Sequence, residues 1–421
     1  MNRILPQGVA KLRHARELEG KIVRDNSRPR SRATFWKPLF RTIMPPKKQP
    51  TIWRAEPHTI AKISILRKYL YSWFQILGRT FRGKDIWFVD GFAGPGRYTN
   101  VPEGSPLAAI GAARQALLDA AQSWQAGKIH LVFIEENEGR FRVLQEQVEG
   151  AEKDPRIECH LYIGTFEDGM GRLQSEFKAP FSSPIPFFVF IDPFGALGAP
   201  FSLVSEILQS KSSEVLINLD ADGIGRIFLA ERSAGSDVLL KQIFGNDMWK
   251  SVLVREEPFD ITCRKVLDLY KNNLRNLSGV KYMFSFEMRT TVSGLNYFLL
   301  FCSGHSKGLV KMKESMKHLD QDGSYRFVDS HVGQSNLLRF DDPERYAEIM
   351  WAEFGGRSVT YAEVNDWSLN ETPFVNPKKM LSVLEDRDMI AVSSSDPKRR
   401  KKTFSEESIQ SIHFKKRSPH G

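Results

Sequence analysis

The sequence predicts an α/β fold in which the main domain contains a doubly wound, mostly parallel β-sheet. Three observations support this prediction. Short apolar runs alternate with helical patterns through the first half of the chain, a glycine-rich turn follows the first run, and acidic residues follow several others. Such alternation is typical of parallel strands that are joined by crossover helices and buried on both faces.

The first predicted element is an amphipathic helix at 58–77, where apolar residues recur at intervals of three and four. Five apolar runs that follow it have the length of buried strands. The strands are expected at 86–89, 129–134, 157–163, 187–191 and 215–219. The helices between them are expected at 106–121, 140–148, 170–177 and 201–208.

The pattern changes after Asp222, where a polar, helical insertion is predicted at about 223–278. Two strand-like runs at 281–288 and 297–302 are close enough to pair, with Gly294 in the link, and a helix is expected at 308–319. We assign all of 51–335 to one domain. A helical lobe followed by an antiparallel pair at the sheet edge is typical of Rossmann-like class I methyltransferases.

Residues 340–416 are predicted to form a separate winged helix-turn-helix-like domain. Helices are expected at 345–354, from about 360, and at 376–387, and runs at 389–392 and 403–404 could pair as a hairpin. The basic segment 397–402, which includes Arg399, Arg400 and Lys401, would form the tip of the wing and bind nucleic acid. A solvated loop in a helical tail is the alternative.

Residues 1–50 are predicted to be a disordered basic arm, because they lack periodicity and contain 13 Lys and Arg against 3 acidic residues. A transit peptide is a second interpretation, which the three acids weaken, and translation from Met44 is a third. Residues 398–417 add 8 basic residues against 2 acids, so positive charge is concentrated at the two ends.

The composition excludes several classes of protein. No apolar stretch is long enough to cross a bilayer. The three cysteines are far apart and form no CxxC pattern, so neither a disulfide framework nor a metal site is predicted, and a reducing, cytoplasmic location fits best.

A cofactor site is predicted where the first strands end. Asp90 follows the first strand and leads into Phe92, Gly94 and Gly96, whose glycines can adopt positive φ and let a ligand approach the backbone. Glu135 ends the second strand, where nucleotide-binding folds hold a ribose diol. A tight turn without a ligand and a helix-starting acid are the respective alternatives.

Two further strand ends carry aromatic and acidic residues. After the third strand, Phe166 could stack on an adenine ring while Asp168 or Glu167 accepts from its amino group, although a helix cap explains the same residues. After the fourth strand, Pro193 fixes the turn that presents Asp192, and Phe194 and Gly195 follow. A carboxylate beside an aromatic ring suits an exocyclic amine, so we assign the chemistry to residues 192–195.

Four segments resemble the three-Cys-motif partner (TcmP) family, which is methyltransferase-like. They are HTIAK at 58–62, DGFAGPGRY at 90–98, FIE at 133–135 and IDPFG at 191–195. The resemblance spans about residues 51–415. The turn at 192–195 is also similar to that of tRNA guanine-N2 dimethyltransferases and of adenine-N6 enzymes, but the second proline is absent and Phe194 lacks a hydroxyl. The base identity therefore stays open.

The resemblance implies S-adenosylmethionine as cofactor, methylation of an exocyclic amine of a DNA or RNA base, and a partner protein similar to radical S-adenosylmethionine enzymes. His58 and Lys62 lie one helical turn apart and resemble a pair near the active site of ribosomal RNA adenine methyltransferases, which implies a role in substrate binding. The alternative is a Rossmann-like protein that binds nucleic acid or regulates without transferring a methyl group.

Overall fold

The computed structural model of the chain describes residues 50–181, 184–196, 198–230, 233–289, 296–319, 326–328 and 342–416. The predicted N-terminal arm, the alternative start at Met44 and the link at Gly294 lie outside these residues. Residues from Pro50 onward form one compact unit.

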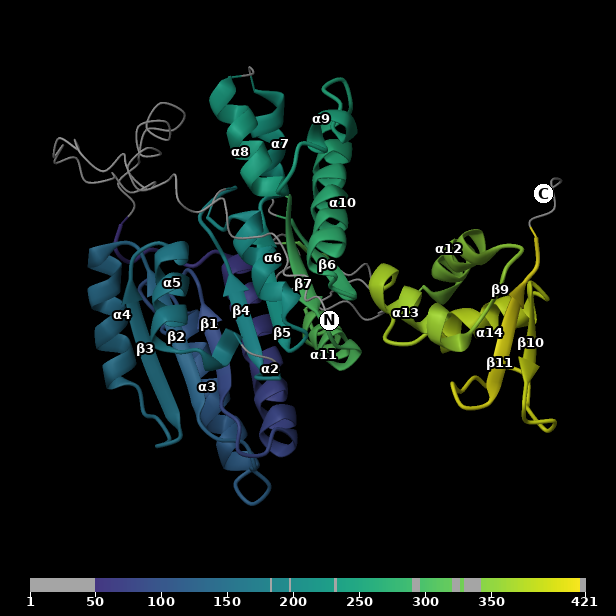
Figure 1. Cartoon of the computed structure of the whole chain (residues 1–421), viewed down its shortest axis with the longest axis horizontal. Helices are drawn as coiled ribbons and strands as arrows, with labels where there is room; N and C mark the ends of the chain where they lie inside the picture. Colours follow the sequence, from purple (N-terminus) through teal and green to yellow (C-terminus); the bar gives the residue numbers. More distant parts are fainter. Residues whose placement is uncertain are drawn as a thin grey trace, which may run out of the picture. The chain divides into compact units, whose positions relative to one another are not determined.

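The centre of this unit is an eight-stranded sheet in the order β3-β2-β1-β4-β5-β7-β6-β8 (Figure 1). Its first five strands are parallel and β7 is antiparallel to both β5 and β6. The strands are β1 Ile86–Asp90, β2 Ile129–Glu135, β3 Ile157–Ile163, β4 Phe187–Ile191, β5 Ser213–Leu219, β6 Tyr282–Arg289, β7 Asn296–Ser303 and β8 Arg326–Val328. This is the predicted Rossmann-like fold of class I methyltransferases.

Helices cover both faces of the sheet, and strands β1, β2, β4 and β5 are therefore buried along their whole length. One hydrophobic core packs α2 Pro57–Thr80, α3 Ser105–Asp119, α4 Glu138–Gly150 and α11 Ser306–Lys317 against one face. The opposite core packs α5 Phe166–Glu176, α6 Phe201–Gln209 and the inserted helices against the other. A single 3-10 turn lies at Ala179–Phe181.

The predicted helical insertion consists of α7 Ala221–Leu229, α8 Ala234–Phe244, the short α9 Trp249–Val252 and α10 Phe259–Ser278. Its core is continuous with that of the sheet, since Trp249 and Tyr270 are buried together with residues of β5 and β7. Strand β8 was not predicted. Among the described helices, none is both long and apolar enough to cross a membrane.

The C-terminal part contains three helices and a separate antiparallel sheet of order β10-β11-β9. Its elements are α12 Pro343–Phe354, β9 Ser358–Val359, α13 Tyr361–Glu371, α14 Lys378–Asp386, β10 Ile390–Ser394 and β11 Ile409–Phe414. The prediction that 403–404 pairs with the first hairpin strand was wrong, because β11 takes that place. Phe404 is instead buried in the core of this part.

Candidate cofactor and substrate site

The glycine-rich turn after β1 contains two glycines in the left-handed region of backbone conformation. Gly94 and Gly96 have φ of 61° and 76°, values that a residue with a Cβ adopts only at a cost. The N–H of Ala93 donates to the carbonyl of Ile134 at 2.9 Å, which ties the turn to the end of β2. The turn therefore lies beside Glu135, as the parallel pairing of β1 and β2 requires.

Asp90 is fully buried at the start of this turn. Its Oδ1 accepts from the N–H of Phe92 at 3.2 Å, whereas Oδ2 accepts no hydrogen bond from the described residues. Burial raises the pKa of Asp90 to about 7, although the Ser105 side chain and the N–H of Phe92 oppose the rise, and the nearby Asp192 and Glu135 carboxylates add to it. An unsatisfied, buried carboxylate is costly, so a cationic or hydroxyl-bearing ligand would stabilise it.

Glu135, at the end of β2, is also buried. Its Oε1 accepts from the N–H of Asn137 at 2.8 Å, and the guanidinium of Arg140 lies 4.0 Å away. Burial raises the pKa of Glu135, while the N–H groups of Asn137 and Gly94 oppose the rise. Two buried acids thus flank the glycine turn at the carboxyl edge of the sheet, where open α/β sheets bind ligands.

Asp192, directly after β4, is held by two residues from other elements. Nζ of Lys62, on α2, lies 2.7 Å from both carboxylate oxygens, and Nδ2 of Asn218, on β5, donates to Oδ1 at 2.8 Å. The Asp192 side chain is still 22% exposed. Lys62, for which a role near the active site was predicted, therefore contacts Asp192 directly.

An aromatic cluster lies over the turn. The ring of Trp53 contacts those of Tyr98 and Phe194 edge-to-face at 5.6 Å and 5.4 Å. The guanidinium of Arg140 lies 4.9 Å from the Trp53 ring and 5.0 Å from that of Phe194. Phe194 remains 53% exposed, and φ of 94° at Gly195 turns the chain directly after it.

The residues Trp53, Tyr98, Arg140 and Asn218 are additions to the predicted site. Burial raises the pKa of Tyr98, and the carboxylates of Asp192 and Asp90 raise it further, so this phenol lies within the field of both acids. Trp53 precedes the first helix in a segment without periodicity. Its backbone carbonyl accepts from the N–H of Thr99 at 2.9 Å, a long-range contact with no sequence signal.

In the structure Asp168 forms the helix cap that was the alternative explanation of these residues, and Phe166 is buried. Phe166 is only 2% exposed and packs 5.7 Å from the ring of Phe92, so it offers almost no face to an adenine. Asp168 accepts from the hydroxyl of Thr165 at 2.8 Å in a capping box at the start of α5. Ile163, which pairs with Glu135 and is 42% exposed, is more accessible to an adenine ring than Phe166 is.

The other predicted substrate-binding residues divide between two places. His58 stacks on Tyr297 of β7, with the ring centroids 5.7 Å apart. In the loop between β10 and β11, Arg400 and Lys401 are exposed, but Arg399 forms a two-point ion pair with Glu385 at 2.9 Å and 3.1 Å. Arg399 thus holds the loop against α14 and does not present its charge to a ligand.

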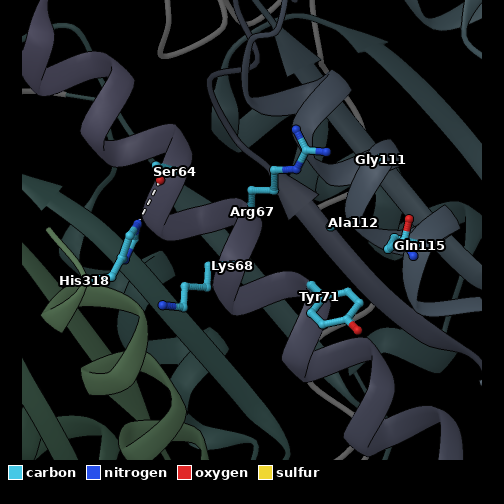
Figure 2. Close-up of a pocket in the computed structure, with 8 residues that line it drawn as sticks. All are labelled: Ser64, Arg67, Lys68, Tyr71, Gly111, Ala112, Gln115 and His318. Atoms are coloured by element: carbon cyan, nitrogen blue, oxygen red, sulfur yellow. Dashed lines mark hydrogen bonds between the residues drawn. The ribbon is translucent and has the colours of Figure 1, made fainter. Parts of the chain in front are cut away.

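A shallow hollow of about 360 Å³ lies elsewhere, between α2, α3 and α11 (Figure 2). Arg67, Lys68 and Tyr71 of α2 line it, and Ser64 contacts His318 across it at 3.0 Å. None of its lining residues belongs to the carboxyl edge of the sheet, so this hollow is separate from the candidate site.

Comparisons with known proteins identify no family for this chain. No protein family model and no curated protein matches the chain. Among solved structures, an O-methyltransferase from Bacillus cereus with SAH is 12% identical over 63% of this chain and 96% of its own, with a TM-score of 0.29. Trm1 from Pyrococcus horikoshii with S-adenosyl-L-methionine is 10% identical over 87% of this chain and 94% of its own, with a TM-score of 0.31.

A protein from Porphyromonas gingivalis W83 that is described as a methyltransferase is 11% identical over 53% of this chain, with a TM-score of 0.23. The aligned region spans only 38% of that protein. Similarities this low carry no argument about function. The strand order and pairing of this chain support the fold assignment.

Proposed function

We propose that this protein is an S-adenosylmethionine-dependent methyltransferase that acts on an exocyclic amine of a nucleic acid base. The observation that carries the proposal is the arrangement of Asp192 between Lys62 and Asn218 beside the exposed ring of Phe194. A carboxylate offers about four acceptor positions, and the two partners occupy three of them. Oδ2 can therefore accept one N–H from a substrate amine.

This geometry suits amine positioning. An accepted N–H fixes the direction of the nitrogen lone pair, and Phe194 can stack on the ring that carries the amine. Lys62 and Asn218 hold Asp192 in one orientation, so the acceptor does not need to reorganise when the substrate binds. Alignment of this kind is the main requirement of an in-line methyl transfer, after which the nitrogen proton can leave to solvent.

The residues at the sheet edge fit S-adenosylmethionine. Asp90, with its unsatisfied Oδ2, would accept from the amino acid ammonium, the Gly94 turn would admit the ligand, and Glu135 would accept from the ribose hydroxyls. Bound there, S-adenosylmethionine would supply a sulfonium-activated methyl group. The two buried acids would favour a ligand with positive charge over its neutral, demethylated product.

A nucleic acid substrate is supported by charge at the C-terminal part of the chain. Arg400 and Lys401 are exposed in the long loop between β10 and β11, where they can reach phosphates. This interpretation assigns the winged-helix-like domain to substrate binding and the sheet edge to chemistry. A protein that only binds nucleic acid would have the same exposed charges, and the two functions differ at Asp192.

The deciding experiment compares Asp192→Asn with the wild-type protein. We expect the variant to keep binding S-adenosylmethionine in calorimetry and to keep binding nucleic acid, while transfer of labelled methyl to cellular DNA or RNA falls by about 100-fold or more. Asp119→Asn, which changes an exposed carboxylate on α3, is the matched control. Transfer that survives in Asp192→Asn would contradict the assigned chemistry, and absence of cofactor binding in the wild type would favour the binding-only protein.

We also propose a three-Cys-motif partner protein, related to radical S-adenosylmethionine enzymes, on the strength of the four resembling segments alone. Co-expression with a candidate partner, followed by size-exclusion chromatography, tests it. Co-elution at a fixed stoichiometry is the expected result, and independent elution of the two proteins at micromolar concentrations would contradict the proposal.

A further inference from the structure

A second cluster of ionisable side chains lies near the starts of strands β2 and β3. Nδ1 of His130 is 3.0 Å from Nε2 of His160 and 3.4 Å from Oε2 of Glu158. All three atoms lie within 4.8 Å of one another. Two imidazole nitrogens and a carboxylate oxygen thus converge on one small volume.

The register of the sheet causes this convergence. His130 pairs with Glu158, and Val132, two residues further along β2, pairs with His160. Because side chains two apart on a strand share a face, all three side chains lie on the same side of the sheet. Trp87 of β1 stacks on the His130 ring with centroids 3.8 Å apart and an interplanar angle of 6°, which fixes the plane of that ring.

Neighbouring residues contact two further polar atoms of the cluster. Oδ2 of Asp85 lies 3.4 Å from Nε2 of His130, the ring nitrogen that does not face His160 and that forms no hydrogen bond with the described residues. Oδ1 of Asp85 accepts from the N–H of Lys128 at 2.8 Å, and the ammonium of Lys128 pairs with Oε1 of Glu158. Asp85 thus lies beside the outer nitrogen of His130, and Lys128 beside the outer oxygen of Glu158. Nδ1 of His130 and Oε2 of Glu158 remain directed toward the centre of the cluster, and carboxylates that contact ligand histidines orient the rings in the same way in known metal sites.

We propose that His130, Glu158 and His160 bind one divalent transition-metal ion of the zinc class. The donor set of two imidazoles and one carboxylate suits Zn²⁺ and leaves a fourth position for water. Contact distances of 3.0 Å and 3.4 Å are close to the separations of ligand atoms around a tetrahedral ion with bonds of about 2.0–2.1 Å.

The proposed ion has a structural role. Glu135 lies five positions beyond His130 along β2, a distance of about 16 Å. The ion would therefore be too far from the candidate cofactor site to take part in methyl transfer. Strand β3 is at one edge of the sheet (Figure 1), and two of the three ligands lie on it. The ion would therefore fasten the edge strand to its neighbour.

The fixed charges around the cluster also bear on the binding of a cation. Two carboxylates, those of Asp85 and Glu158, lie at the cluster, against one half-exposed ammonium group, that of Lys128, which contacts the outer oxygen of Glu158. A divalent cation would thus enter a site whose fixed charges favour it.

The test uses the full chain without a histidine tag, freed of metal with EDTA and then dialysed. Zn²⁺ is titrated in competition with a chromophoric chelator, and thermal melting is recorded with and without the ion. We expect one equivalent bound and a higher melting temperature with Zn²⁺. His160→Gln and Glu158→Gln should each weaken binding by about tenfold or more.

His413→Gln, which changes an exposed histidine on β11, is the matched control and should bind like the wild type. Melting of the metal-free variants establishes that they fold. Failure of the folded wild type to bind Zn²⁺, or equal binding by wild type and His160→Gln, would overturn the proposal. Excess Mg²⁺ should not displace the ion, since Mg²⁺ prefers oxygen ligands.

Discussion

Substitution of Asp90 by asparagine should stabilise the ligand-free protein at high pH and weaken cofactor binding at the same time. Asp90 is fully buried, and its Oδ2 accepts no hydrogen bond from the described residues. Its ionised form is therefore unfavourable in the folded chain unless a ligand is bound. Asparagine has nearly the same shape but carries no charge, so the substitution removes this cost.

The pKa of Asp90 sets the size and the pH range of the effect. Burial raises this pKa from 3.8 to about 7, so the folded protein holds the proton more tightly than the unfolded chain does. The stabilising contribution is complete below pH 3.8 and is lost as the pH rises through 7. At 1.36 kcal/mol per pH unit, this loss amounts to about 3 kcal/mol between pH 5 and pH 8.

The assay is urea denaturation of both proteins at several pH values from 5 to 8. The difference in unfolding free energy between Asp90→Asn and wild type should increase in favour of the variant by up to about 3 kcal/mol over this range. Using the difference cancels the contribution of groups that titrate equally in both proteins. A difference that does not change with pH would refute the reasoning.

Cofactor binding provides an independent check. If the ammonium of S-adenosylmethionine pairs with Asp90, binding below pH 7 must displace the proton, and the affinity of the wild type should rise with pH up to about 7. Asp90→Asn should bind more weakly and lose this dependence. A wild-type affinity that is flat between pH 5.5 and pH 8 would contradict the assignment of Asp90 while leaving the stability prediction intact.

Three further variants test other parts of the structure. Lys313→Met should destabilise the chain by about 3 kcal/mol or more in urea denaturation, because the buried Nζ of Lys313 donates to three backbone carbonyls at 2.6–3.4 Å; an unchanged midpoint would contradict this. Asn218→Ala should lower methyl transfer about tenfold but leave cofactor affinity unchanged, because Asn218 contacts Asp192. The double variant Arg400→Ala and Lys401→Ala should reduce the slope of log affinity against log salt by about 2, and an unchanged slope would place the nucleic acid elsewhere.

Buried parallel strands were predicted well because they read as uninterrupted apolar runs. The run at 187–191, which is apolar throughout, coincides with β4. Helix starts were less accurate because caps decide them. The helix expected from 170 begins at Phe166, since Thr165 and Asp168 form a capping box that moves the boundary back by one turn.

The hairpin of the C-terminal part shows where local patterns fail. Phe404 is apolar and was assigned to a strand, but it packs into the core from a loop. The strand that pairs with β10 lies at β11, beyond a loop that the Arg399 and Glu385 ion pair holds in place. Because that ion pair joins residues 14 apart on different elements, the loop length could not be predicted from periodicity.

Strand topology explains which site residues the sequence could reveal. Parallel strands end at the same edge of the sheet, so acids that follow separate strands, such as Asp90, Glu135 and Asp192, can be predicted to meet. Trp53 and Arg140 approach this edge from other elements, and their contacts with Phe194 depend on tertiary packing alone. Side chains that cover such a site from other elements thus cannot be predicted from the residues at the strand ends.

Phe166 illustrates the opposite error. It follows β3 at the predicted edge, but as the first residue of α5 its side chain turns toward the sheet and packs below Gly91. A Cβ on Gly91 would lie 2.6 Å from the Phe166 ring, so the small residue in the motif makes room for this ring and not for a ligand. Glycine in such a turn therefore has two physical explanations, and Gly94 and Gly96 have the second one, a positive φ that a residue with a Cβ adopts only at a cost.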